Sequence, residues 1–302
     1  LQVDLTLADE KSEVFAPELR NEMNSWTFPL HFIDFETSMV ALPFTKGRKP
    51  YEQVAFQFSA HTLHKDGRME HHEWIDTNQG VFPNYEFVRQ LKAVLEKDDG
   101  TIFKYSPHEN TVLNQIKTQM LDDDESKYGD LIEWIETITS WDEGGVKGSG
   151  YRNMVDLLQM VRKYYYHPDM GGSNSIKKVL PAVMTGDAVK KKYSKPSDFG
   201  THLKGRVLWE LNPETGKPEN PYHLLPGQYG DLDLNQDELI LEDANIQEGG
   251  AAMMAYAKMQ FTDMTDEERE ALRNALLQYC ELDTLAMVMI YEHWESSLGS
   301  EQ

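Results

Sequence analysis

The sequence predicts an α/β domain with one core, in which helices cover the faces of a small mixed β-sheet. Two observations carry this prediction. Short β-rich runs and helical stretches follow one another after residue 29 in the order strand, strand, strand, helix, strand, helix, helix. The composition, with 40% hydrophobic and 26% charged residues among 302, is that of an ordinary globular protein. The C-terminal half is expected to be mainly helical, with an irregular part.

Apolar and β-branched runs predict the first three strands, at 30–37, 53–63 and 69–76. The first run is short and mostly apolar, and Pro29 precedes it, which favours a buried strand over a helix. Between the second and third runs, Lys65-Asp66-Gly67-Arg68 is typical of a hairpin turn. We therefore expect these two strands to be adjacent and antiparallel.

After the third strand, the sequence predicts one helix and one more strand, and then mainly helices. Apolar residues at helical spacing predict a helix over 85–96, and a fourth strand is expected over 101–105. Further helices are expected at about 109–120, 129–139, 152–164, 175–181, 249–260 and 266–293. Residues 185–247 are rich in Pro, Gly, Asn, Lys and Asp, and are too long for an ordinary loop, so we expect an ordered insertion. Residues 1–28 are polar and acidic, and are interpreted as a lead-in segment or linker.

The charge balance excludes some classes of protein. Asp and Glu number 51 against 29 Lys and Arg, so the net charge is −22. Such a chain repels polyanions at long range, which argues against a passive nucleic-acid-binding module. An enzyme that meets phosphates through carboxylate-bound metal ions stays compatible with it. No run approaches the ~20 apolar residues of a membrane helix, no leader is visible, and Cys280 is a single cysteine, so we expect a cytoplasmic protein.

Two carboxylates in the first strand form the centre of the candidate site. Asp34 and Glu36 are two residues apart, so both side chains lie on one face of the strand. Buried acids need a counter-charge, and a divalent cation such as Mg²⁺ or Mn²⁺ suits oxygen ligands. The alternative is that both acids lie at a strand end and reach solvent.

Two further acids that could join the candidate site are expected on helices, one within the last predicted helix and one at the start of another. One face of the last predicted helix carries four residues at three- and four-residue spacing: Leu272, Leu276, Tyr279 and Asp283. Asp283 therefore lies on a face that should be apolar, unless the helix is rotated and the carboxylate is solvated. Glu109 lies where the fourth strand passes into the next helix, and its alternative role is to stabilise the helix dipole.

These motifs together resemble the DnaQ-like, ribonuclease D-like superfamily of 3′–5′ exonucleases, called DEDD after its four acids. Asp34-Phe35-Glu36 matches the first motif of that superfamily. Glu109 takes the place of the second motif, where the superfamily usually has Asp. Tyr279 and Asp283 match the tyrosine form of the third motif. The resemblance covers about residues 29–295 and implies a ribonuclease H-like fold for them.

The sequence is most similar to a bacterial family of unknown function. Three runs carry this similarity: Phe32 to Thr37, Ser175 to Pro181, and Tyr279 to Met287. In that family the domain often follows a RecB-like nuclease domain. The similarity therefore implies an upstream nuclease domain of the same protein as a partner.

The resemblance implies a metal-dependent 3′–5′ exonuclease, a hydrolase of phosphodiester bonds at the 3′ end of single-stranded DNA or RNA. Asp34, Glu36, Glu109 and Asp283 would hold two Mg²⁺ or Mn²⁺ ions about 3.5–4 Å apart. Tyr279 would orient the attacking water, because a phenol of ordinary pKa is a poor base at neutral pH. Two alternatives stay open: a non-catalytic binding or assembly domain that serves an attached nuclease, and a two-metal phosphodiesterase acting on very short oligonucleotides.

Other polar residues are weaker candidates. Two basic clusters either contact phosphates or form solvated surface: Lys177 with Lys178, and Lys190, Lys191 and Lys192 with Lys195. Asp156 either joins the site or has a capping or core-polar role. His71 and His72 have no third ligand nearby in the sequence, so we interpret them as surface residues of a strand and not as a zinc site.

Overall fold

The computed structural model describes residues 1–8, 10–225 and 250–299. In this part of the chain a central sheet of five strands has the order β4-β3-β2-β5-β8. Its strands are β2 (Leu30–Ser38), β3 (Val54–Leu63), β4 (Met69–Ile75), β5 (Ile102–Lys104) and β8 (Val155–Asp156). β2, β3 and β4 pair antiparallel, whereas β5 pairs parallel with β2 and with β8. The predicted small mixed sheet is confirmed.

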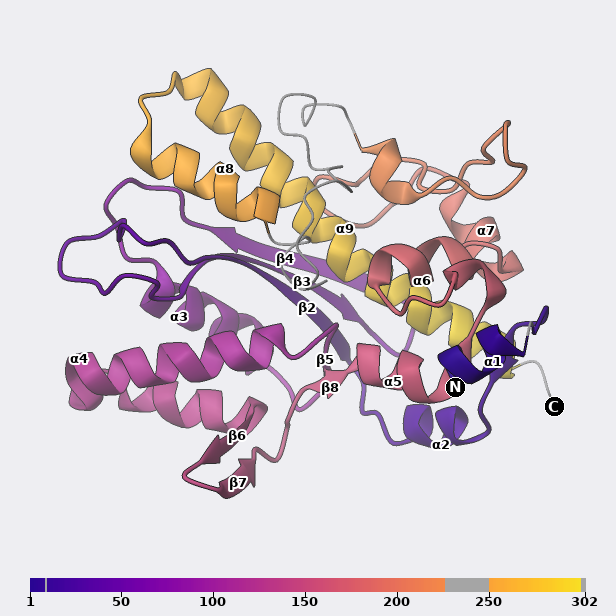
Figure 1. The fold of residues 1–302 in the computed structure, drawn as a ribbon, viewed down its shortest axis with the longest axis horizontal. Coiled ribbons are helices and arrows are strands. Elements are labelled where there is room, and N and C mark those ends of the chain that lie inside the picture. The colour runs from indigo at the N-terminus through magenta and orange to yellow at the C-terminus, as the bar shows by residue number, and fades with distance from the viewer. Residues whose placement is uncertain (9, 226–249, 300–302) are drawn as a thin grey trace.

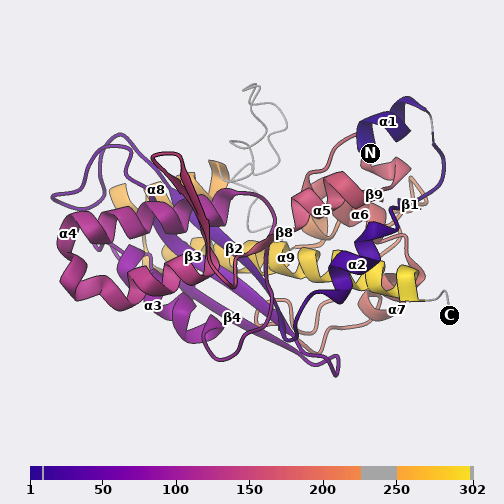
Figure 2. The same cartoon turned by 90° about the horizontal axis from the view of Figure 1, so that it is seen from below.

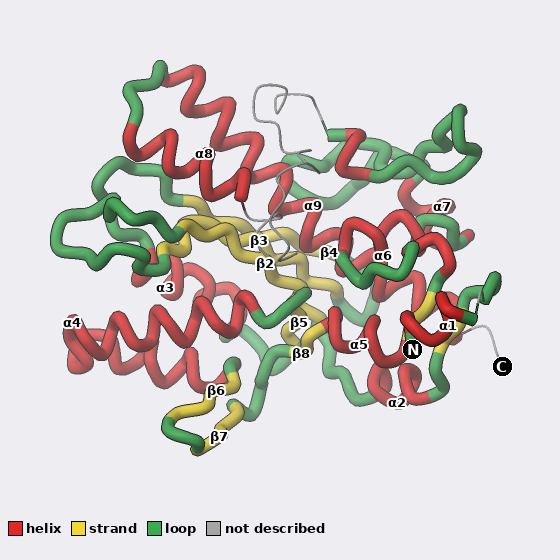
Figure 3. Tube along the Cα trace, in the orientation of Figure 1, coloured by secondary structure: helices red, strands yellow, loops and turns green. Residues whose placement is uncertain are grey.

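Helices cover both faces of the sheet (Figure 1; Figure 3). On one face lie α3 (Asn84–Leu95) and α4 (His108–Ile138), and on the other lie α8 (Gly250–Phe261) and α9 (Asp266–Gly299). Further helices gather near the C-terminal half of α9: α5 (Leu157–Tyr164), α6 (Ile176–Val183), α7 (Asp187–Tyr193) and the short η1 (Pro168–Met170). The predicted α/β class with a mainly helical C-terminal half is confirmed.

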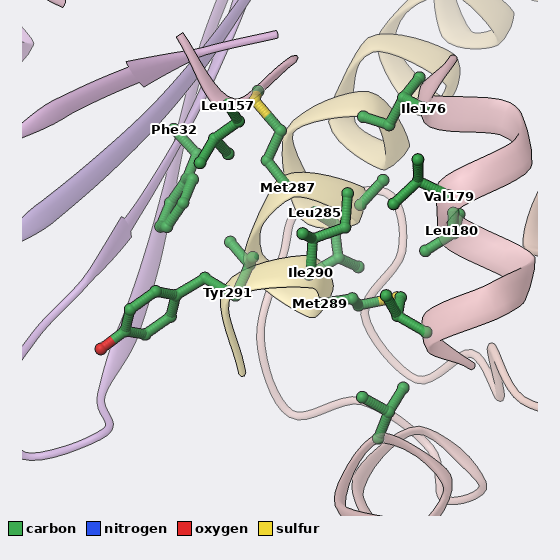
Figure 4. Packing of buried hydrophobic residues seen from close by; sticks show 14 of the residues in the cluster. Phe32, Leu157, Ile176, Val179, Leu180, Leu285, Met287, Met289, Ile290 and Tyr291 are labelled. Carbon is green, nitrogen blue, oxygen red and sulfur yellow. The ribbon is translucent and has the colours of Figure 1, made fainter. Parts of the chain in front are cut away.

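The alternation of side chains along β2 divides the hydrophobic core in two. Ile33 and Phe35 are buried against α3 and α4. Phe32 points to the opposite face, where its ring stacks on Phe103 with centroids 4.9 Å apart. There it belongs to a second cluster, which α6 and α9 complete (Figure 4). Since residues two apart share a face, Asp34 and Glu36 also point toward α9.

The start of α9 follows from its sequence. Thr265 Oγ1 accepts a hydrogen bond from the Glu268 amide at 3.2 Å, and the Glu268 carboxylate accepts one from the Thr265 amide at 2.9 Å. This reciprocal pair is a capping box, which satisfies backbone donors that the first helical turn leaves free. Leu276 is buried against β3 and α8, and Leu272 packs on the same cluster, so the apolar face of the helix is confirmed.

Several elements differ from the sequence prediction. The helices predicted at 109–120 and 129–139 are both in α4, which kinks at Asp124 (φ −167°, ψ 93°). The helix expected from residue 152 begins only at Leu157, because the two preceding residues form β8. The sequence pattern missed the hairpin of β6 (Ser140–Glu143) and β7 (Val146–Ser149). Its turn is Gly144-Gly145, with φ values of 60° and 85°, which a two-residue hairpin turn of type I′ requires.

The predicted insertion is only partly described, because residues 226–247 lie outside the described residues. Its described part contains α7 and the short helix η2 (Pro221–Leu224). Both elements contact α9. The described part of the insertion is therefore packed on α9, and the insertion of 185–247 as a unit stays a prediction.

Among residues 1–8, 10–225 and 250–299, no helical segment combines the length and the hydropathy of a membrane span.

The N-terminal segment is tied to the helical end of the molecule (Figure 2). It contains α1 (Gln2–Leu7), β1 (Val14–Phe15) and α2 (Glu18–Asn24), and β1 pairs antiparallel with β9 (Tyr165–Tyr166). The Glu13 carboxylate lies 2.6 Å from Nε2 of His293 and accepts a hydrogen bond of 2.8 Å from the Tyr165 hydroxyl. The domain boundaries predicted at residues 1–28 and 29–295 stay predictions, although this segment contacts the core directly.

Glu13→Ala should destabilise the protein, because it leaves the buried polar groups of Tyr165 and His293 without their shared acceptor. We expect the free energy of unfolding to fall by about 1–3 kcal/mol in urea titrations. Arg20→Ala, at an exposed position of α2, should change it by less than ~0.5 kcal/mol. Equal stability of the two variants would show that this contact does not anchor the segment.

Candidate metal-binding active site

Buried hydrogen bonds fix the position of α9 over the sheet. Gln57 Nε2 on β3 donates to the Leu276 carbonyl at 2.9 Å. Further along the same strand, Ser59 Oγ and His61 Nδ1 each lie 2.8 Å from Oγ1 of Thr284. Alternate residues of a strand share one face, so these three side chains of β3 all reach α9. Two helix turns of α9 are thereby held in register with β3.

Four carboxylates come together where β2, the first turn of α4 and α9 meet. Asp34 and Glu36 lie on β2, Glu109 lies in the first turn of α4, and Asp283 lies on α9. Cys280, one turn before Asp283, places its sulfur 3.4 Å from Oδ2 of Asp34. The possible ligand atoms of Asp34, Glu36 and Cys280 lie within 4.8 Å of one another. The structure thus brings together all four acids that the sequence singled out.

Burial and mutual repulsion raise the pKa values of three of these acids. Burial is the largest cause for Asp34, Glu36 and Glu109, and the charge of Asp283 raises all three pKa values further. The pKa of Glu109 rises to about 7, with Asp156 adding to the effect of burial. Carboxylates crowded in this way are stabilised by a positive counter-charge, and a bound divalent cation is the largest local charge a site can have.

One carboxylate oxygen of Glu109 is available as a metal ligand. Glu109 is only 2% exposed, and among the described residues its Oε2 is buried without a hydrogen-bond partner. Buried polar atoms are nearly always paired, because an unpaired one costs about 1–3 kcal/mol. A hard divalent cation, which takes oxygen ligands, would satisfy this atom. The residues present therefore fit the metal ions that the sequence predicted.

Two tyrosines and a lysine border the carboxylates. The rings of Tyr279 and Tyr222 lie 5.4 Å apart, and the Tyr222 hydroxyl donates to Oδ1 of Asp283. Lys177 Nζ lies 5.5 Å from the ring centre of Tyr279 and 5.8 Å from that of Tyr222. Its positive charge opposes the rise in the pKa of Glu36. Lys177 thus places a cation beside the acids.

Sequence reasoning missed Tyr222 and Cys280 as site residues. Tyr222 belongs to η2 in the insertion, and no spacing pattern relates it to α9. Cys280 lies inside the Tyr279 to Asp283 motif, so its place on the inner face of the helix could have been inferred from that motif.

Asp156 has a capping role, which is one of the two alternatives that the sequence allows. Its Oδ1 accepts hydrogen bonds from the Leu158 and Gln159 amides, at 3.0 and 3.4 Å, at the start of α5. Its Oδ2 lies 3.4 Å from Nζ of Lys104. It also raises the pKa of Glu109, so it lies at the border of the carboxylate cluster.

Three other lysines of the two predicted basic clusters have different surroundings. Lys178 is exposed on α6. Lys190 lies with Nζ 4.8 Å from the Trp209 ring centre, and Lys192 Nζ is 2.5 Å from a carboxylate oxygen of Glu292. Lys190 and Lys192 thus make contacts that hold α7 against Trp209 and against Glu292 of α9.

The interpretation of His71 as a surface residue is wrong. Its side chain is 1% exposed, and its ring centre lies 4.6 Å from that of His61 on the neighbouring strand. His72, the next residue, has a side chain that is 33% exposed. The sequence pattern missed this difference because the ring of His71 is covered by Thr201, from the distant insertion, whose Oγ1 lies 2.8 Å from Nδ1.

The comparisons with known proteins give one match. A family model described as a domain of unknown function, DUF2779, matches residues 31–175, which include Asp34, Glu36 and Glu109. No curated protein and no solved structure matches the chain. The match agrees with the predicted similarity to a family of unknown function, and it leaves the exonuclease superfamily as a proposal.

Glu109→Gln should stabilise the metal-free protein, and the gain should grow with pH. The pKa of Glu109 is about 7 in the folded chain, against about 4.3 for a free Glu, so the folded state holds this proton to higher pH. The wild type therefore loses stability between these pH values, as the native carboxyl is forced to ionise. Urea unfolding in EDTA at pH 5.5 and 7.5 should show the gain increase by about 1–2 kcal/mol.

The matched control for this measurement is Glu86→Gln, at an exposed position of α3. Its pKa is lowered, chiefly by a hydrogen bond from Gln90, so Glu86 is ionised at both pH values in both states. Its effect on stability should be the same at pH 5.5 and 7.5. A pH-independent effect of Glu109→Gln would contradict the raised pKa.

Proposed function

We propose that this protein is a metal-dependent 3′–5′ exonuclease that acts on single-stranded nucleic acid. The observation that carries the proposal is the cluster of two buried acids, Glu36 and Glu109, with two half-buried ones, Asp34 and Asp283. They are drawn from β2, α4 and α9. Buried acids without a counter-charge are costly, and clusters of perturbed titratable groups mark functional sites. The order and spacing of the acids match the superfamily named above.

The donor set favours two hard divalent cations. Asp34, Glu36, Glu109 and Asp283 would hold Mg²⁺ or Mn²⁺, which prefer carboxylate oxygens. When bound, two such ions activate a water and stabilise the charge on the leaving oxygen of a phosphodiester. Tyr222 donates to Asp283 and so fixes the orientation of that carboxylate.

The chain itself supplies orientation and a positive charge. Tyr279 lies one helix turn before Asp283, and its hydroxyl would orient the attacking water by a hydrogen bond. Lys177, half-buried beside Tyr279, would contact a substrate phosphate. This lysine matters because the overall charge of −22 repels a polyanionic substrate at long range.

The same negative charge favours a second candidate, a phosphodiesterase for very short oligonucleotides. Repulsion grows with the number of phosphates that approach the surface, so di- and trinucleotides meet less of it than long strands. The acids and Tyr279 would have the same roles in this reaction.

Activity and metal binding should respond differently to two substitutions in α9. Asp283→Ala removes a ligand, so both hydrolysis and the rise in melting temperature caused by Mn²⁺ should be lost. Tyr279→Phe removes one hydroxyl, so the Mn²⁺ effect should survive while turnover falls roughly 10- to 1,000-fold. The assay uses labelled single-stranded DNA and RNA with Mn²⁺, with EDTA as blank. Glu267→Gln, exposed in the first turn of α9, is the control.

Each outcome of this assay has a meaning. Full activity of the Tyr279→Phe variant would show that Tyr279 contributes only to packing and not to hydrolysis. Hydrolysis of di- and trinucleotides alone would favour the second candidate. A wild type that binds Mn²⁺ but cleaves no substrate would indicate a non-catalytic domain serving an attached nuclease, and a wild type that ignores Mn²⁺ would refute the metal site.

Lys177→Ala should weaken substrate binding more than turnover. Removal of one phosphate contact should raise KM about tenfold. It should also make the slope of log affinity against log salt concentration shallower by about one. Lys178→Ala, at the exposed neighbouring position, is the matched control and should leave KM nearly unchanged. Equal effects of both substitutions would show that the contribution of Lys177 is only general surface charge.

A further inference from the structure

A second cluster of possible metal ligands lies between α9 and the strands β3 and β4. His61, His71 and Glu281 each offer one ligand atom, and these atoms lie within 4.8 Å of one another. None of the three side chains is more than 1% exposed. Successive residues of a helix are about 100° apart, so Glu281 and Asp283 point in very different directions from α9. The cluster is therefore separate from the four carboxylates.

Hydroxyl groups hold one nitrogen of His61 and both nitrogens of His71, where Thr201 Oγ1 lies beside Nδ1. His61 Nδ1 lies 2.8 Å from Thr284 Oγ1, and His71 Nε2 lies 2.9 Å from Ser59 Oγ. The other nitrogen of His61, Nε2, is buried and has no hydrogen-bond partner among the described residues. The other nitrogen of His71, Nδ1, lies 3.9 Å from Oε1 of Glu281. Histidines that bind metal are typically held in this way, with the second nitrogen fixed by an outer partner.

The carboxylate of Glu281 is held by a loop of the insertion. Its two oxygens accept hydrogen bonds from the Thr201 and His202 amides, at 2.8 and 2.7 Å. The loop approaches so closely that a side chain on Gly200 would lie 2.3 Å from Oε1, and its φ of +86° also favours glycine. The carboxylate is thus fixed in a buried position, beside two imidazoles, by backbone groups that leave it lone pairs for a further partner.

We propose that His61, His71 and Glu281 bind a divalent transition-metal ion of the zinc class. Two imidazoles and one carboxylate suit such an ion, whereas the all-oxygen cluster suits Mg²⁺ or Mn²⁺. The ion would provide a partner for the buried Nε2 of His61, which has none in the part of the chain that the structure describes. It would also replace the weaker contact between Nδ1 of His71 and the Thr201 hydroxyl, which the structure places 2.8 Å apart.

The geometry and protonation of the cluster support this site. Two ligands of a tetrahedral zinc ion lie about 3.3–3.4 Å apart, so the 3.9 Å from His71 to Glu281 needs to shorten by only about half an ångström. Burial lowers the pKa of His61 well below its usual value and that of His71 to about 4. Both imidazoles are therefore neutral near pH 7, which is the form that binds metal.

An ion at this place would join three elements. His61 lies on β3, His71 on β4 and Glu281 on α9, and the next turn of α9 carries Thr284, which contacts the same strand. Binding to the native state alone stabilises it. The ion would therefore stabilise the placement of α9 and, through it, of Asp283. It would act as a structural ion and would take no part in hydrolysis.

The test uses Co²⁺ as a zinc-class probe, in a chain that also carries Asp34→Asn and Asp283→Asn to disable the carboxylate site. We expect about one equivalent of Co²⁺ per chain, with visible absorption typical of nitrogen ligands, and competition by Zn²⁺. Adding His71→Gln should weaken Co²⁺ binding roughly 100-fold or more. His72→Gln, the neighbouring position on the opposite face of β4, should leave binding unchanged.

Two results would overturn the proposal: less than about a tenth of an equivalent of Co²⁺ in the carboxylate-disabled chain, or equal binding by the His71→Gln and His72→Gln chains. If circular dichroism shows that His71→Gln does not fold, Ser59→Ala takes its place. That change removes the outer hydrogen bond of His71 and keeps every ligand, so it should weaken binding about 10- to 100-fold, and unchanged affinity would refute the site. No readout involves nuclease activity, so the result is independent of the proposed function.

Discussion

The register of α9 over β3 is the constraint on which the site depends. Gln57, Ser59 and His61 each use a buried polar group to hold this helix, through the Leu276 carbonyl and the Thr284 hydroxyl. Each such bond adds only about 1 kcal/mol, but leaving one partner unpaired in the core costs more. The bonds therefore select one helix position among many that apolar contacts alone would allow. A shift of one residue would rotate Asp283 by about 100°, away from Asp34 and Glu36.

The carboxylate cluster works against folding, and the two hydrophobic cores on either side of β2 compensate for it. Burial raises the pKa values of Asp34 and Glu36, so their ionised forms destabilise the native state near neutral pH. The clusters around Ile33 on one face and Phe32 on the other supply apolar burial worth about 1.5–3 kcal/mol for each large side chain. Such a conflict between local cost and overall stability is what functional sites commonly show.

The sequence was sufficient for the parts that local patterns determine. A short apolar run predicted β2, and apolar residues at helical spacing predicted α9. Residue spacing then assigned Asp34, Glu36 and Asp283 to their faces. Features that depend on distant pairing were missed. β8 has only two residues and exists because β5 lies beside it, and the hydrogen bond from Tyr222 to Asp283 joins the insertion to α9. Neither leaves a periodic signal in the chain.

The bond from Tyr222 to Asp283 has a consequence for how this architecture can vary. Surface insertions are usually the parts of a fold that evolution or an engineer can shorten freely. Here a residue of the insertion touches one of the four acids, and a loop of the same insertion, at Thr201 and His202, binds Glu281 in the core. Trimming this segment would expose one carboxylate and unpair another. Although it is an insertion in the sequence, this segment therefore forms part of the core that surrounds Asp283 and Glu281.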